Sequence, residues 1–191
     1  MLVDISLSKT RIQQNMEGIM DYKKSIREVP DFPKKGILFY DITTLLSNAE
    51  VFKHILDDMT ARAKSMNITK LAAIESRGFI FGAPMAERLG VPFIPLRKPG
   101  KLPYKTKRHE YTLEYGKDAI EIHEDAVSKG DKVLIVDDLL ATGGTIDAAA
   151  ALVKECGADV AGLMFVIELN FLNGRDKLKN YKIESLVRYD S

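Results

Sequence analysis

Apolar and polar positions along the chain follow two spacings, and each spacing predicts one kind of element. Apolar residues recur at three- and four-residue intervals over one stretch, which predicts an amphipathic helix from about Glu50 to Met66. Helix-like segments also occupy 78–90 and 145–157. Short apolar runs predict buried strands at 71–75, 92–98, 132–139 and 160–169.

The order of these segments predicts the fold class. Strands and helices alternate, so we expect an α/β fold in which a mostly parallel twisted sheet carries helices on both faces, with right-handed crossovers. Residues 111–123 are expected to form two strands joined around Gly116. The segment before them, from Leu96 to His109, holds six Lys or Arg residues and no acid, and is typical of a solvated loop.

Composition excludes several classes of function. The 191 residues are 46% hydrophobic, which suits one globular domain. Because 28 Lys and Arg nearly balance 27 Asp and Glu, we expect neither a nucleic-acid partner nor a membrane partner. Cys156 is the one cysteine, which suits a reducing, cytoplasmic location, and the three histidines show no metal-binding spacing.

The segment VLIVDDLLATGGT carries the clearest candidate chemistry. Asp137 and Asp138 stand where a predicted strand ends, which is the edge at which open α/β sheets bind ligands. The loop that follows offers unobstructed amides, two hydroxyls and a helix N-terminus, all suited to a phosphate. This phosphate-binding loop comprises Ala141, Thr142, Gly143, Gly144 and Thr145.

Two carboxylates beside a phosphate site suit a vicinal diol, since each hydroxyl can donate to a carboxylate oxygen. A phosphorylated ribose has that shape. The loop lacks the lysine of GxxxxGK[ST], and no GxGxxG occurs, so a nucleoside triphosphate or NAD is disfavoured. The alternative is a plain strand-end acid pair followed by an ordinary turn in which Thr145 caps the helix.

This segment resembles the phosphoribosyl pyrophosphate (PRPP) motif of type I phosphoribosyltransferases, in the form found in the adenine phosphoribosyltransferase branch. Four further stretches resemble that branch in the same order: PDFPKKGILFYDIT, ESRGF, RKPGKLP and YTLEYG. The resemblance runs from about Met20 to the C-terminus. It implies a single domain over 20–191, with MDYKKSIREVPDFP as a first helix and turn, and leaves residues 1–19 as an extension of unknown role.

The resemblance also implies an activity: transfer of the phosphoribosyl group from PRPP to adenine, giving AMP and pyrophosphate. Mg²⁺ would be held mainly through PRPP, with no dedicated protein ligand set. Asp137 and Asp138 would bind the ribose. The expected pyrophosphate residues are Ser76, Arg77, Gly78, Arg97, Lys98 and Lys101.

Base recognition and proton transfer are implied for two other segments. By resemblance, backbone groups of Leu38 and Tyr40 would read the adenine edge while Phe39 stacks on the ring. Glu114 would exchange a proton with the purine at N7, beside Tyr115, and the basic segment would form a flexible hood over PRPP. A homodimer is the expected assembly.

Two rival functions stay open. A phosphoribosyltransferase for a 6-oxopurine such as xanthine or guanine would use the same PRPP loop with a different base pocket. A non-catalytic PRPP-sensing regulator would need a DNA-binding module, for which the balanced charge and the residues before PDFP provide no support.

Overall fold

The computed structural model describes residues 20–113 and 116–191. The chain divides into two compact units, residues 1–52 and 53–191, and each is described by itself. The predicted single domain over 20–191 stays a prediction.

The first unit contains a short antiparallel strand pair. A 3-10 helix, η1 (Tyr22–Ser25), precedes β1 (Arg27–Pro30), which pairs with β2 (Leu38–Asp41) before the short helix α2 (Thr43–Leu46). The expectation that MDYKKSIREVPDFP forms a helix and a turn is therefore met only in part, because β1 lies between the short helix and the turn. One helical turn forms, and the chain becomes extended before the two prolines, which favour extended backbone at the residues that precede them.

The turn between β1 and β2 is held by its own polar groups. Asp31 Oδ1 accepts a hydrogen bond of 2.7 Å from the amide of Gly36, which has a φ of +87°. The rings of Phe32 and Phe39 meet edge to face at 5.1 Å. Leu38 is 41% exposed whereas Tyr40, on the same face two residues later, is buried, so burial increases along this face of β2.

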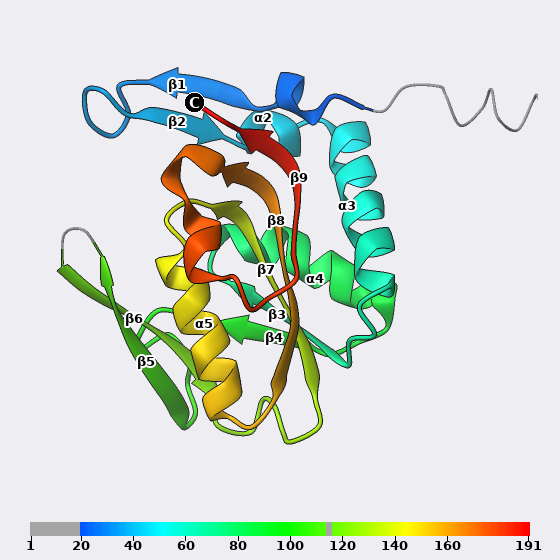
Figure 1. Cartoon of the computed structure of the whole chain (residues 1–191). Coiled ribbons are helices and arrows are strands. Elements are labelled where there is room, and N and C mark those ends of the chain that lie inside the picture. Colours follow the sequence, from blue (N-terminus) through cyan, green and yellow to red (C-terminus); the bar gives the residue numbers. More distant parts are fainter. Residues whose placement is uncertain (1–19, 114–115) are drawn as a thin grey trace, which may run out of the picture. The chain divides into compact units, whose positions relative to one another are not determined.

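The second unit is built on a five-stranded sheet in which every neighbouring pair is parallel (Figure 1). The strands, in sheet order, are β4 (Phe93–Leu96), β3 (Lys70–Ile74), β7 (Lys132–Leu140), β8 (Asp159–Leu169) and β9 (Ile183–Tyr189). The α/β class and the parallel sheet are confirmed. Strand β9 was not among the predicted elements.

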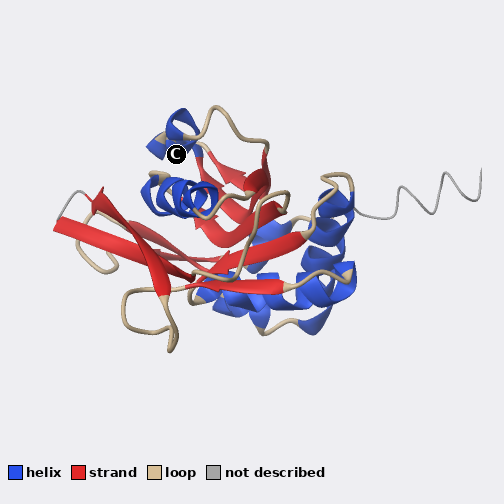
Figure 2. Cartoon of the chain, turned by 90° about the horizontal axis from the view of Figure 1, so that it is seen from below, coloured by secondary structure: helices blue, strands red, loops and turns tan. Residues whose placement is uncertain are grey.

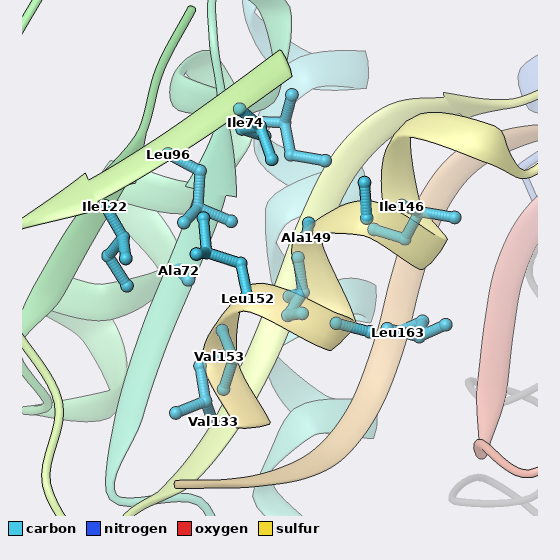
Figure 3. Close-up of a cluster of buried hydrophobic side chains, with 14 of the residues drawn as sticks. Ala72, Ile74, Leu96, Ile122, Val133, Ile146, Ala149, Leu152, Val153 and Leu163 are labelled. Atoms are coloured by element: carbon cyan, nitrogen blue, oxygen red, sulfur yellow. The ribbon is translucent and has the colours of Figure 1, made fainter. Parts of the chain in front are cut away.

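Helices cover both faces of this sheet (Figures 1 and 2). The unit's main helices are α3 (Ala49–Lys64), which begins in the first unit, α4 (Arg77–Leu89) and α5 (Gly144–Glu155). Figure 3 shows Ala72 and Ile74 of β3 packed in a buried cluster with Ala149 and Leu152 of α5. The alternate residue Ala73 faces α4, because a Cβ on Gly82 would lie 2.6 Å from that of Ala73.

An antiparallel hairpin forms the part of the chain that was predicted as a hood. Strands β5 (Thr106–Leu113) and β6 (Gly116–His123) pair along their length. The hairpin is held to the C-terminal end of α5, where Glu155 accepts hydrogen bonds from Lys107 at its carbonyl (3.0 Å) and contacts His109 at its carboxylate (2.8 Å). The predicted loop from Leu96 to His109 is thus shorter than expected, since its last residues lie in β5.

The C-terminal region also contains two 3-10 helices, η2 (Asn170–Leu172) and η3 (Gly174–Lys177), between β8 and β9. Across residues 20–113 and 116–191, no helix combines the length and the apolar character needed to cross a bilayer.

Candidate active site

The predicted site residues gather where two central strands of the sheet end. Strand β3 lies next to β7 and leads to Glu75, Ser76 and Arg77. Strand β7 carries the carboxylate pair near its end and leads to the phosphate-binding loop. The connection from β3 leads to β4 on one side, and β7 connects to β8 on the other. The site therefore lies at the point where the direction of strand addition reverses, which is where ligands bind in such sheets.

The phosphate-binding loop lines a pocket of about 190 Å³. All five predicted loop residues, from Ala141 to Thr145, contribute to the pocket wall, together with both aspartates and Arg77. Gly143 precedes α5 with a φ of +79°, a conformation that favours glycine. The loop thus presents its backbone and a helix N-terminus to the pocket, as the sequence predicts.

The two aspartates are placed differently. Asp138 is buried, and its Oδ2 accepts a hydrogen bond of 2.5 Å from Arg77 Nε. Asp137 Oδ1 accepts a hydrogen bond of 2.9 Å from the Asp138 amide. Burial, and then the negative charge of Asp138, raise the pKa of Asp137 well above its usual range. A ligand that donates hydrogen bonds to this carboxylate would favour its ionised form.

Arg77 begins helix α4 at the end of β3. The helix approaches β7 closely, because a Cβ on Gly78 would lie 2.9 Å from the carbonyl oxygen of Val136 and 3.0 Å from Asp137 Oδ1. Only glycine suits that approach. The Arg77 side chain is 49% exposed, so it reaches from Asp138 toward solvent at the pocket.

A second pocket of about 280 Å³ shares Arg77, both aspartates and Thr145 with the first. Glu75, Ser76 and Lys98 complete its polar lining. The predicted phosphate-binding loop and the predicted pyrophosphate residues therefore meet along one continuous set of side chains. Arg97 and Lys101 do not line either of these two pockets.

Arg97 and Lys101 are instead bound to Glu75. Its buried carboxylate accepts a hydrogen bond of 2.7 Å from Arg97 Nε, pairs with Lys101 Nζ at 2.9 Å, and accepts one of 2.9 Å from the Lys98 amide. Burial alone would raise the pKa of Glu75, but these cationic and amide donors outweigh it and lower the pKa. Sequence reasoning missed this residue, although an acid directly before SRG, followed by the basic RKPGK segment, was a usable signal.

Lys98 is held by a separate acid on the hairpin. Its Nζ pairs with Asp118 and lies 2.8 Å from the hydroxyl of Tyr111, which in turn lies 3.1 Å from Asp118 Oδ2. Burial works against the charge of Lys98, yet Asp118 and Tyr111 raise its pKa, so it stays protonated at neutral pH. Neither Tyr111 nor Asp118 was predicted as a site residue.

The remaining predicted residues cannot be related to these pockets. Leu38, Phe39 and Tyr40 lie in β2 of the first unit, and Glu114 and Tyr115 lie outside the described residues. Within 20–113 and 116–191, no group of three or more His, Cys, Asp or Glu side chains is arranged to hold a metal ion.

Known proteins with similar sequences identify the family. A family model for the phosphoribosyl transferase domain matches residues 43–187. An adenine phosphoribosyltransferase of Clostridium perfringens is 59% identical over 171 residues, which cover 90% of this chain and 99% of that protein. The chain belongs to the adenine phosphoribosyltransferase family. A second family member, from Synechococcus, is 55% identical over 171 residues and is covered completely.

Solved structures of adenine phosphoribosyltransferases share the fold. The enzyme of Thermoanaerobacter pseudethanolicus is 54% identical and superposes with a TM-score of 0.85, over 87% of this chain and 97% of that one. The Saccharomyces cerevisiae enzyme, 40% identical with a TM-score of 0.82, over 86% of this chain and 95% of that one, was solved with an imino-altritol bisphosphate and adenine.

Proposed function

We propose that the protein transfers the 5-phosphoribosyl group of PRPP to adenine, giving AMP and pyrophosphate. One observation carries the proposal: a carboxylate pair and a phosphate-binding loop share a pocket wall with the cationic end of a neighbouring strand. Adenine phosphoribosyltransferases that are 59% and 55% identical, matched over nearly their whole length, support adenine as the base.

The ribose 5-phosphate part of PRPP suits the first pocket. The 5-phosphate would accept hydrogen bonds from the amides of the loop from Ala141 to Thr145, with help from the N-terminus of α5. The two ribose hydroxyls would donate to Asp137 and Asp138. Those bonds would hold both carboxylates in the ionised form, against the burial and repulsion that raise the pKa of Asp137.

The pyrophosphate suits the second pocket. Arg77 and Lys98 line it, and the amides of Ser76 and Gly78 lie at the start of α4. Arg97 and Lys101 would add positive charge from the Glu75 cluster. As the bond from C1′ to the pyrophosphate oxygen breaks and N9 of adenine bonds to C1′, these cations would stabilise the leaving charge.

A divalent cation fits this site as a ligand of PRPP. Mg²⁺ commonly keeps several waters and binds one or two carboxylates plus substrate phosphates. Because Asp137 and Asp138 would bind the ribose hydroxyls, Mg²⁺ would be held mainly through the phosphates of PRPP. When bound, Mg²⁺ would neutralise pyrophosphate charge.

The roles of the base-binding residues rest on the family resemblance. Backbone groups of Leu38 and Tyr40 would distinguish a 6-amino from a 6-oxo purine, because a wrong base leaves a buried polar group unpaired. Phe39 would stack on the ring. Glu114 would exchange the proton at N7 while N9 attacks, beside Tyr115 in the hood.

Assembly and location are also inferred. Family membership supports a homodimer. The single cysteine, half-buried Cys156, supports a reducing compartment such as the cytoplasm.

A purine competition tests the proposed function. Purified protein is given PRPP and Mg²⁺ with adenine, hypoxanthine, guanine or xanthine, and nucleotide formation is followed for each base. We expect AMP alone, and we expect Glu114→Gln and Asp138→Asn to lose most activity. If the protein used a 6-oxopurine, the proposed PRPP site would stand and the assignment of adenine as the base would be wrong. PRPP binding without product from any base would favour the sensor function.

A further inference from the structure

The phosphate-binding loop rests on a second glycine, far from it in the sequence. A Cβ on Gly143 would lie 2.6 Å from the carbonyl oxygen of Gly174, well inside van der Waals contact. A Cβ on Gly174 would clash still more strongly with the carbonyl oxygen of Ala141. The backbone of η3 therefore packs directly against the loop that lines the first pocket.

The residue after Gly174 is anchored to a buried acid. Arg175 donates from Nε to Oε1 of Glu168, and from Nη2 to Oε2 at 2.8 Å. Only 2% of the Glu168 side chain is exposed. Ser185 donates to the same carboxylate, and Arg188 Nε lies 3.3 Å from it. This paired geometry fixes the orientation of Arg175 as well as its distance.

Glu168 is also tied to the loop through the sheet. In the pairing of β7 with β8, Glu168 is the partner of Leu140, which directly precedes Ala141. A closed path of contacts runs from Ala141 to Gly174, through Arg175 and Glu168, and back through Leu140. The start of the phosphate-binding loop is thus held by two contacts: Leu140 pairs with Glu168 in the sheet, and Ala141 packs against Gly174.

Stability alone is a weak reason for such an arrangement. Replacing a buried ion pair by apolar residues of similar volume is often neutral or stabilising. Burial would raise the pKa of Glu168, but hydrogen bonds from Arg175 and Ser185 outweigh it and lower the pKa, so the carboxylate stays ionised at neutral pH.

We propose that Glu168 and Arg175 are positioning residues, which hold Gly174 against the phosphate-binding loop so that the loop amides point at the 5-phosphate of the ligand. The proposal rests on the proposed function of that loop. Neither side chain has to touch the substrate. Their effect is confined to the ribose-phosphate pocket, because the cations that line the second pocket are held by other acids, Arg77 by Asp138 and Lys98 by Asp118.

The test measures the two halves of PRPP separately. Calorimetric titrations determine the Kd of ribose 5-phosphate, and of pyrophosphate with Mg²⁺, for the full-length protein and for Glu168→Gln and Arg175→Lys. We expect the Kd of ribose 5-phosphate to rise at least about tenfold in both variants, because small displacements of a binding group are costly. The Kd of pyrophosphate should stay within about twofold. In steady-state assays the KM for PRPP should rise much more than kcat falls.

Ser185→Ala is the matched control. It removes one hydrogen bond from the same buried carboxylate and leaves the link between Glu168 and Gly174 in place, so it should lower stability without changing the Kd of ribose 5-phosphate. Equal weakening of both ligands in Glu168→Gln and Arg175→Lys would show a general structural role and overturn the proposal. Unchanged binding of ribose 5-phosphate in folded variants would also overturn it.

Retained pyrophosphate binding shows that each variant is folded, and the conservative Arg175→Lys remains measurable if Glu168→Gln fails to fold. The outcome for the unaltered protein separates this inference from the proposed function. If that protein fails to bind ribose 5-phosphate, both are wrong. If it binds and the variants bind equally well, only the positioning role is wrong.

Discussion

The two pockets at the end of the sheet are built by opposite means. The proposed ribose-phosphate pocket is formed by backbone amides, glycines and two aspartates on β7. The proposed pyrophosphate pocket depends on long cationic side chains, and each of these already contacts an acid of the protein. The phosphate-binding loop of the first pocket could accept a phosphate with little change, whereas the cations of the second would exchange internal ion pairs for contacts with the ligand.

The difference implies that affinity is controlled differently in each half. In the first pocket, binding depends on the exact path of the backbone, so a single methyl group can abolish it. In the second, the acids would compete with pyrophosphate for Arg77, Lys98 and Lys101. Removing a competing acid should strengthen binding there, and removing a cation should weaken it.

The largest effect is expected for Gly143→Ala. The added Cβ would meet Gly174 at 2.6 Å, and φ is +79°, so the loop must move. Activity at low PRPP should fall by about 100-fold. The Kd of ribose 5-phosphate should rise in parallel while that of pyrophosphate changes little.

Gly130→Ala is the control for that variant. Gly130 also has a positive φ, +95°, but a Cβ there would have no neighbour within 4 Å. It should lose about 1 kcal/mol of stability from backbone strain and keep its activity. Equal loss of activity in both variants would contradict the idea that the shape of the loop is what matters.

Arg77→Met should produce the converse pattern, with a smaller effect. It removes a charged donor from the second pocket, so the Kd of pyrophosphate should rise about tenfold, since a hydrogen bond to a charged group contributes about 1.5–3 kcal/mol. Ribose 5-phosphate should be affected much less. A larger loss for ribose 5-phosphate would mean that Arg77 acts mainly by organising Asp138.

Asp137→Asn should make the protein more stable as well as less active. The raised pKa of Asp137 means that the folded state retains a proton that the unfolded state has lost. The stability of the natural protein therefore falls as pH rises from the ordinary carboxyl range to the raised pKa. Thermal unfolding should show a higher Tm for Asp137→Asn at about pH 8, and near-equal values at about pH 4. A lower Tm at the higher pH would contradict the burial argument.

The smallest effect, and the only gain of binding, is expected for Asp118→Asn. The variant removes the negative charge that pairs with Lys98 inside the protein. Because this ion pair is partly exposed, the gain should be small, and the Kd of pyrophosphate should decrease by about twofold. Titration at low and high salt would test this, since the gain should shrink as salt screens the charges. Weaker pyrophosphate binding would show that Asp118 aims Lys98 at the ligand.

The sequence predicted those elements whose conformation is determined by their own residues and not by distant pairing partners. Strands expected at 71–75 and 132–139 correspond to β3 (Lys70–Ile74) and β7 (Lys132–Leu140), because short apolar runs between turns leave few alternatives. Strand β9 was missed because IESLVRY mixes charged and apolar residues, and its pairing with β8 decides its conformation. The first helix was assigned by resemblance, and it is shortened to the single turn of η1 because the chain becomes extended before the prolines.

The same division holds for the site. The phosphate-binding loop and both aspartates are adjacent in the sequence, so one motif contains them. Glu75 meets Arg97 across 22 residues, and Lys98 meets Asp118 across 20, through strand pairing that no spacing rule encodes. The contact of Gly174 with Gly143 could not be predicted either, because the two residues are distant in the sequence and meet only in the folded structure.

The strand order has a consequence for synthesis of the protein on the ribosome. Arg77 and Asp138 are 61 residues apart and become neighbours only when β7 pairs with β3. The loop then lacks its support until η3 and β9, the last elements described, have emerged and docked beside β8. Because a nascent chain folds from its N-terminus, the proposed ribose-phosphate site would be completed only after η3 and β9 have emerged, and shorter nascent chains would not bind the ligand.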